Sequence, residues 1–250
     1  MGKRIIPLLA VDPQGALQDA VQIPRARGSS DPVEVADAYA EAGADELMFV
    51  APGSSPERLA ALILSVAASV SLPVSVKADF GSLDQLGPIL EAGAARVVLQ
   101  SAALGDPDLI SAAAGAFSAD RIAVEIEALR QDDHWRVRLG AADDLTEWDP
   151  ETWARVVEAQ GGGELIVGSA VPGAFGEPLD LELLSAVTSA VGVPVVAKGE
   201  GVGVEDLFDA LMIGGAEGVL VGDALHSARY SVRDIKKYLS EHGLPVDFSE

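Results

Sequence analysis

The chain has 250 residues, of which 49% are hydrophobic, so it can bury a large core and is not a disordered polymer. Its 39 acidic and 17 basic side chains give a formal net charge of −22. This charge excludes nucleic acids and anionic membrane surfaces as partners, because no basic surface is available to displace their counterions. Cysteine is absent, which excludes disulfides, thiol nucleophiles and cysteine-based metal sites.

The first residues do not have the pattern of a targeting segment. The apolar run over 5–11 is too short for a signal peptide, and no small-residue cleavage pattern follows it. The longest uncharged run, over 59–76, is interrupted by Pro73 and contains several serines. That composition favours a buried helix leading into a strand over a membrane span. We therefore expect a soluble, cytoplasmic protein.

Short apolar runs alternate with helical patterns along the whole chain. The predicted strands cover residues 4–11, 45–50, 73–78, 95–100, 121–127, 164–169, 194–198 and 217–222. Helix starts are marked by a capping side chain directly before a proline, at Asp31, Ser55, Asp106 and Asp149. Ser82 with Gln85 forms a capping box in the same way. The fully apolar strands indicate a parallel sheet that is covered by helices.

Three further segments interrupt or close this alternation. A turn at 131–133 and an alternating pattern over 134–139 predict a hairpin that extends the fifth strand. Three glycines at 161–163 precede a strand and predict the C-terminal turn of a helix. Residues 231–242 predict an amphipathic closing helix whose charges, on Arg233, Lys236 and Lys237, form a solvated face.

Three pairs of similar segments recur in the same order. Residues 72–77 match 193–198, residues 43–47 match 161–165, and residues 93–99 match 215–221, at offsets of 121, 118 and 122. Eight strand–helix units built as two similar halves predict a single (βα)8 barrel domain over 1–250, with half-repeats at about 1–120 and 121–250. A doubly wound parallel sheet is the alternative, and the similarity of the halves favours the closed barrel.

Ionisable side chains gather where a barrel carries out chemistry, at the C-terminal ends of its strands. Because side chains alternate along a strand, Glu125 and Glu127 point into the barrel when Val124 and Ile126 face the helices. The same parity places Lys77 with Asp79, and Lys198 with Glu200, while Asp12 and Asp223 follow the first and last strands. The residues predicted to contact substrate are Gln100, Ser101, Ser169, Glu200 and Asp223.

Two interpretations of this cluster remain open. The lysines can pair with the glutamates in a buried salt-bridge network. Alternatively, the carboxylates perform acid–base chemistry or a lysine forms a Schiff base. Lys198 is predicted to be the free, reactive amine and Lys77 the permanently paired one, because Glu200 and Asp223 beside Lys198 are expected to be wetter. No cofactor and no metal are expected, although a Mg²⁺ or Ca²⁺ site made of carboxylates alone stays open.

Several motifs resemble the cyclase subunit of imidazole glycerol phosphate synthase, of the HisF type, over essentially the whole chain. The most specific stretches are residues 3–6, Arg27 with 31–34, residues 43–47 and residues 232–243. The resemblance implies a barrel with two-half symmetry and two catalytic aspartates, at the ends of the first and fifth strands. The first of these positions is Ala10 here, with Asp12 two residues beyond it, and the second is Glu127.

The resemblance also implies two phosphate sites in glycine-rich turns. Here those turns are residues 77–80 and 198–201, with Asp223 as the partner position of the second turn. Asp79, Glu200 and Asp223 add negative charge, which disfavours a bisphosphate. A ring of four charges at the barrel bottom is implied at Arg4, Glu46, Arg96 and Glu164. It is either a salt-bridge plug, which we favour, or an ammonia gate facing a glutaminase-type subunit.

Three hypotheses about function follow. The preferred one is a diverged lyase- or cyclase-type enzyme for a small substrate that lacks two phosphates, with Glu127 as base and with Glu125, Asp79, Lys77 and Lys198 as partners. The second is the cyclase subunit itself with an atypical site. The third is a non-catalytic or engineered barrel scaffold.

Overall fold

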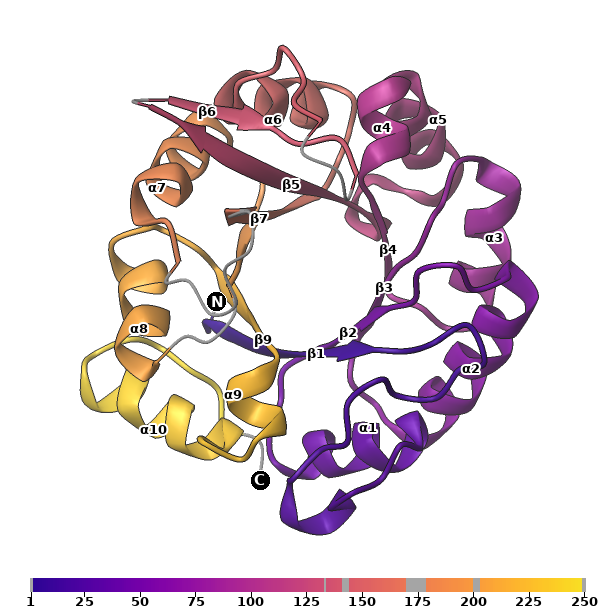
Figure 1. Ribbon diagram of the computed structural model, residues 1–250, viewed down its shortest axis with the longest axis vertical. Helices are drawn as coiled ribbons and strands as arrows, with labels where there is room; N and C mark the ends of the chain where they lie inside the picture. Colours follow the sequence, from indigo (N-terminus) through magenta and orange to yellow (C-terminus); the bar gives the residue numbers. More distant parts are fainter. Residues whose placement is uncertain (1, 133, 141–143, 170–178, 200–202, 249–250) are drawn as a thin grey trace. The chain divides into compact units, whose positions relative to one another are not determined.

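The computed structural model describes residues 2–132, 134–140, 144–169, 179–199 and 203–248. Figure 1 labels its elements. The strands are β1 Arg4–Ala10, β2 Leu47–Val50, β3 Val74–Lys77, β4 Arg96–Leu99, β5 Ile122–Gln131, β6 His134–Val137, β7 Glu164–Ser169, β8 Val195–Lys198 and β9 Gly218–Val221. All eight predicted strands are confirmed, most of them within two residues at either end, and β6 is the predicted hairpin partner of β5.

Ten α-helices and two short 3₁₀ turns connect these strands in the described residues. The helices are α1 Pro32–Glu41, α2 Pro56–Ser69, α3 Leu83–Glu91, α4 Ser101–Gly105, α5 Asp108–Phe117, α6 Pro150–Ala159, α7 Leu181–Ala190, α8 Val204–Met212, α9 Asp223–His226 and α10 Val232–Glu241. The 3₁₀ turns are η1 Pro24–Ala26 and η2 Ala119–Arg121. In the part of the chain that the structure describes, no helix has the length and apolar character that crossing a bilayer requires.

The hydrogen-bonded strand order is β4-β3-β2-β1-β9-β8-β7-β5-β6, and β4 also pairs with β5. This additional pairing closes the parallel strands into a ring, with the antiparallel β6 outside it. The fold is therefore a closed eight-stranded (βα)8 barrel, as predicted. The doubly wound alternative is wrong, because an open sheet would leave β4 and β5 as unpaired edges.

The capping signals act as predicted at three helices. Asp31, Ser55 and Asp149 accept hydrogen bonds from the backbone N–H groups of the first turns of α1, α2 and α6, at 2.9, 3.4 and 2.8 Å. Asp106 also accepts the backbone N–H of Asp108, at 3.2 Å, but α5 begins at Asp108, one residue later than predicted.

The repeated segments share a backbone requirement. Gly43 and Gly161 are equivalent in the repeat, and both have positive φ, at 86° and 91°, directly after a helix. Gly93 and Gly215 are equivalent too, at 111° and 75°. Left-handed backbone after a helix favours glycine. The repeat in the sequence therefore marks repeated helix-to-strand turns.

By its contacts the chain forms two compact units. Unit 1 comprises Met1–Phe80, Asp84–Val97 and Leu220–Glu250, and unit 2 comprises Gly81–Leu83 and Val98–Val219. Strands β4 and β9 contribute residues to both units. The one-domain organisation expected from the sequence stays a prediction.

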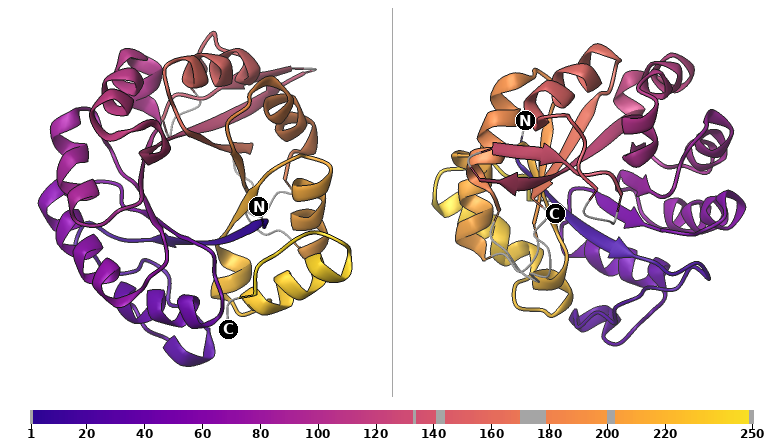
Figure 2. Two further views of the ribbon diagram at one scale, coloured as in Figure 1. Left: turned by 180° about the vertical axis from the view of Figure 1, so that it is seen from behind. Right: turned by 45° about the horizontal axis from the view of Figure 1, so that its top comes forward.

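Within unit 2, the β5–β6 hairpin lies beside α6 and α7, as Figure 1 and the two views of Figure 2 show. Arg130 pairs with Glu182 at 2.8 Å and lies over the Trp135 ring, 5.0 Å from its centroid. The Trp135 Nε1–H donates to Asp180, the residue that caps α7, at 2.9 Å. These contacts fasten the hairpin to the start of α7.

Candidate functional site

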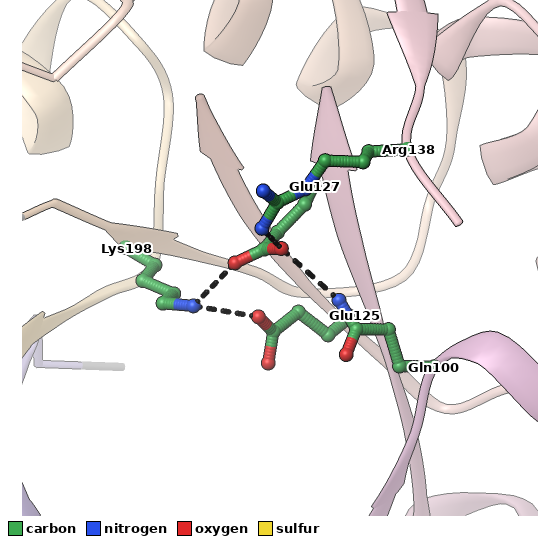
Figure 3. Close-up of polar contacts among 5 residues, drawn as sticks. All are labelled: Gln100, Glu125, Glu127, Arg138 and Lys198. Atoms are coloured by element: carbon green, nitrogen blue, oxygen red, sulfur yellow. Dashed lines mark hydrogen bonds and ion pairs between the residues drawn. The ribbon is translucent and has the colours of Figure 1, made fainter. Parts of the chain in front are cut away.

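The site in unit 2 is built on β5, whose side chains alternate between two faces of the strand. Val124 and Ile126 are fully buried, and Glu125 and Glu127 share the opposite face, as predicted. Lys198 is the last residue of β8. Its ammonium reaches both glutamates, with Nζ 2.7 Å from Glu125 Oε1 and 2.7 Å from Glu127 Oε1 (Figure 3). The predicted lysine–glutamate network is confirmed for Lys198.

Sheet register explains how a side chain on β8 reaches β5 across β7. Gly168 pairs with Glu127 on one side and with Lys198 on the other, so the three residues lie in one row. A Cβ added at Gly168 would lie 3.4 Å from Lys198 Cβ and 3.6 Å from its Cδ. Because Gly168 has no side chain, the Lys198 side chain can pass over β7 and reach β5. Sequence reasoning missed Gly168, although a glycine inside a strand is a signal of close approach.

Two further groups hold the second oxygen of Glu127. Arg138 Nη2 lies 2.5 Å from Glu127 Oε2, and Gln100 Nε2 donates to the same oxygen at 3.3 Å (Figure 3). Arg138 follows β6, and its backbone N–H donates to the Glu127 carbonyl at 2.7 Å. Gln100, a predicted site residue, therefore contacts Glu127. Arg138 was not singled out from the sequence. The alternating pattern over 134–139, which predicted the hairpin, was the signal that could have identified this residue.

The cluster is largely shielded from solvent. The side chains of Glu125 and Glu127 are 3% and 13% exposed, and those of Lys198 and Arg138 are 23% and 20% exposed. Two carboxylates and two cations give a formal sum of zero. Buried charges persist when they are paired in this way, because an unpaired one is costly.

The prediction that Lys198 is a free, reactive amine is wrong. Burial by itself lowers the pKa of Lys198, but the charges of Glu125 and Glu127 and their hydrogen bonds more than offset burial and hold that pKa above its ordinary value. A Schiff base requires the neutral amine. Lys198 is therefore a permanent cation that fixes the two glutamates.

The remaining predicted residues of unit 2 do not join the cluster. Ser101 begins α4 and Ser169 ends β7, both half-buried. Within the described ranges neither hydroxyl is hydrogen-bonded to Glu125, Glu127 or Lys198. Glu200 lies outside the described residues.

The site residues predicted in unit 1 are set by local turns. Asp12 Oδ1 accepts the Gln14 and Ala16 N–H groups at 2.9 and 3.0 Å, so this carboxylate builds the turn after β1. Asp79, which is exposed, accepts the Gly53 N–H at 2.8 Å. Lys77 is the half-buried last residue of β3.

The other two positions of unit 1 bear on the resemblance. Ala10, where the resemblance places an aspartate, ends β1 and pairs with Val50. Asp223 is exposed and begins the short helix α9.

At the opposite, N-terminal strand ends, three of the predicted ring residues meet in unit 1. Glu46 accepts from Arg4 and from Arg96, each at 3.0 Å, and also bonds to the Ser75 hydroxyl. The Glu46 side chain is 3% exposed. Glu164, the first residue of β7 in unit 2, is also buried.

The closing helix corrects a second prediction. Lys236 is not on a solvated face: its side chain is 1% exposed, and its ammonium bonds to Asp45 Oδ1 and to the Asp247 carbonyl, each at 2.6 Å. Asp45 Oδ2 accepts the Ile5 N–H at 2.8 Å. Lys236 therefore ties the C-terminal segment to the start of β1. Lys237 is 71% exposed, as predicted.

No metal site accompanies the ion pairs in the described ranges. Nowhere in them do three or more histidine, aspartate or glutamate side chains group as metal ligation would require.

Comparison with known proteins agrees with the resemblance. The family model for histidine biosynthesis protein matches residues 4–231. Imidazole glycerol phosphate synthase subunit HisF from Dehalococcoides mccartyi is 36% identical over 249 residues in strains BAV1 and CBDB1, and 34% identical in strain 195. Each alignment covers 98% of this chain and 98% of the relative. The chain belongs to the histidine biosynthesis protein family and has a HisF-like barrel.

Proposed function

We propose that this chain is a lyase- or cyclase-type enzyme that acts on a small substrate lacking two phosphates, with Glu127 as its proton-transfer residue. The observation that carries the proposal is that both carboxylate oxygens of Glu127 are held by cations. Lys198 binds one of its carboxylate oxygens and Arg138 the other, on β5, the strand where the resemblance places a catalytic carboxylate. Catalytic groups in this fold come from the C-terminal ends of the strands.

The roles of the cluster follow from its charges. Glu127 accepts or returns a proton at Oε2, the oxygen that Arg138 and Gln100 hold. Lys198 acts through its charge, because its pKa is raised and it stays an ammonium. It fixes Glu125 and Glu127 in one geometry, and such positioning lowers the reorganisation needed during proton transfer.

Three features disfavour the bisphosphate of the ordinary cyclase. Ala10 cannot transfer a proton where the resemblance places the second acid–base group. Asp79 lies in the turn after β3, where the resemblance places one phosphate, and its exposed carboxylate repels a phosphate. Asp223 adds a further negative charge at the start of α9.

A second candidate function is the cyclase subunit itself. The identity of 36% over 98% of both chains favours it, as does the name of the relatives, which are subunits of a synthase. Under this candidate a glutaminase-type subunit would dock at the end of the barrel that carries Arg4, Glu46 and Arg96. A third candidate, a scaffold without activity, is favoured by the complete pairing of Lys198.

The test is a turnover screen of small substrates that carry one carboxylate or one phosphate, monitored by mass spectrometry. Conversion by the native protein should fall about 10²- to 10⁴-fold in Glu127→Gln, which keeps the shape of the side chain but cannot accept the proton. Glu182→Gln on α7 is the matched control, since that side chain is 68% exposed. Conversion that survives Glu127→Gln would contradict the role of Glu127.

A further inference from the structure

Arg138 has one donor that the fold does not use. Its Nη2 binds Glu127 Oε2, but its Nε is shielded from solvent and has no hydrogen-bond partner in the described part of the chain. Buried N–H groups are normally satisfied, and an exception calls for an explanation. The guanidinium therefore binds Glu127 through one nitrogen instead of the paired Nε and Nη2 donors that it can offer.

A ligand can reach this side chain. Arg138 is 20% exposed, and it forms an isolated antiparallel bridge with Leu145. Leu145 and Leu139, which follows Arg138 in the chain, are 37% and 39% exposed. The residues next to Arg138 along the chain and across this bridge are therefore accessible to solvent as well.

The other cation of the cluster is Lys198, which is already paired. Its ammonium binds both Glu125 and Glu127 at 2.7 Å, and these ion pairs keep Lys198 charged and fixed in place. An anionic ligand approaching a chain with a net charge of −22 needs a cation that can change partner. In this cluster that cation is Arg138, which is held by one side-chain contact and carries an unsatisfied donor.

We propose that Arg138 receives a single oxyanion group of the substrate, a carboxylate or a phosphate, in exchange for Glu127. Two parallel N–H bonds from Nε and Nη2 match two oxygens of such a group. The exchange satisfies the buried Nε and separates Glu127 Oε2 from Arg138, so that this oxygen faces the substrate that displaced it. The inference rests on the proposed function in taking this cluster as the substrate site.

The experiment follows the Arg138 Nε–H signal in ¹H–¹⁵N spectra during titration with sodium acetate and, separately, with inorganic phosphate. Sodium chloride at equal ionic strength is the control, and the signal is assigned by its loss in Arg138→Lys. We expect a saturable shift with one or both oxyanions at millimolar concentration and none with chloride. A shift with acetate alone assigns a carboxylate substrate, and a shift with phosphate alone assigns a phosphate.

Variants distinguish binding through the paired Nε and Nη2 donors of Arg138 from binding through its positive charge alone. Glu127→Gln removes the competitor and should tighten the Kd by about tenfold or more. Arg138→Lys keeps the charge but loses the paired donors, and should weaken binding by about tenfold or more. Arg136→Lys is the matched control on the same hairpin, because Arg136 bonds only to the Glu147 carbonyl among the described residues and should bind as the native protein does.

An Arg138 signal that oxyanions do not shift, or a Kd unchanged in Glu127→Gln, overturns the inference. Its failure is distinct from failure of the proposed function. Oxyanion binding without any turnover would refute the enzyme and keep Arg138 as a binding residue. Turnover that depends on Glu127, with an Arg138 signal that oxyanions do not shift, would support the enzyme and refute Arg138 as the oxyanion-binding residue.

Discussion

Replacing Lys198 by methionine tests whether this side chain holds the cluster together. Lys198→Met keeps the length of the side chain but leaves Glu125 and Glu127, which are 3% and 13% exposed, without their shared cation. Breaking a buried ion pair by removing one partner costs about 3–5 kcal/mol. For a chain of this size each kcal/mol lowers the Tm by about 2–4 °C. We expect a decrease in Tm of about 6–20 °C at pH 7.

The pH dependence has a defined sign. Because the folded-state pKa of Lys198 is raised, its contribution to stability is fully present below the unfolded pKa of about 10.4 and is lost only at higher pH. The difference between native protein and variant should therefore be constant from pH 7 to 9.

Urea unfolding at fixed m-value measures this difference. Lys237→Met is the matched control: Lys237 is 71% exposed, its contact with Glu241 is 3.9 Å, and the change should stay within about 0.5 kcal/mol. Adding Glu125→Gln to Lys198→Met should recover part of the loss, because it removes one unpaired charge. A Lys198→Met variant within about 1 kcal/mol of the native protein would refute the buried ion-pair account.

Three further changes test other parts of the structure. His226 is half-buried and its Nε2 donates to the Leu8 carbonyl; partial burial lowers its pKa, so the native protein should lose up to about 1.4 kcal/mol per pH unit below pH 6.5. His226→Gln should remove that slope in urea titrations between pH 6.5 and 5, and an unchanged slope would contradict the assignment. Arg4→Ala should cost about 1.5–3 kcal/mol, because Glu46 keeps its bond to Arg96 but loses a charged donor; an unchanged denaturation midpoint would argue against a structural ring. Gly168→Ala should cost about 1–3 kcal/mol, because its Cβ would lie 3.2 Å from the Lys198 carbonyl oxygen; a neutral effect would show that the crossing is not tight.

The fold could be predicted from the sequence because local patterns decided it. Apolar runs located the strands, capping residues before prolines located the helices, and glycines such as Gly43 and Gly161 repeated where helices turn into strands. The shared face of Glu125 and Glu127 followed from strand alternation alone.

The partners of these glutamates could not be predicted in the same way. Parity places Lys198 in the barrel interior, but its contact with β5 depends on sheet register and on Gly168 in the strand between them. Arg138 reaches Glu127 only because the β5–β6 pairing folds the hairpin back. Lys236 looked solvated because its helix is amphipathic, yet its partner Asp45 is 191 residues away in the sequence.

We propose that the family scaffold of this chain carries a site rebuilt for different chemistry. The most direct test is steady-state turnover of the cyclase family's bisphosphate substrate with ammonium, run beside the HisF subunit of Dehalococcoides mccartyi, which is 36% identical. Because Ala10 stands where the resemblance places one of two proton-transfer residues, we predict a kcat/KM about 10²- to 10⁴-fold below that of the relative. A kcat/KM equal to that of the relative would contradict the claim and establish the chain as an ordinary cyclase subunit.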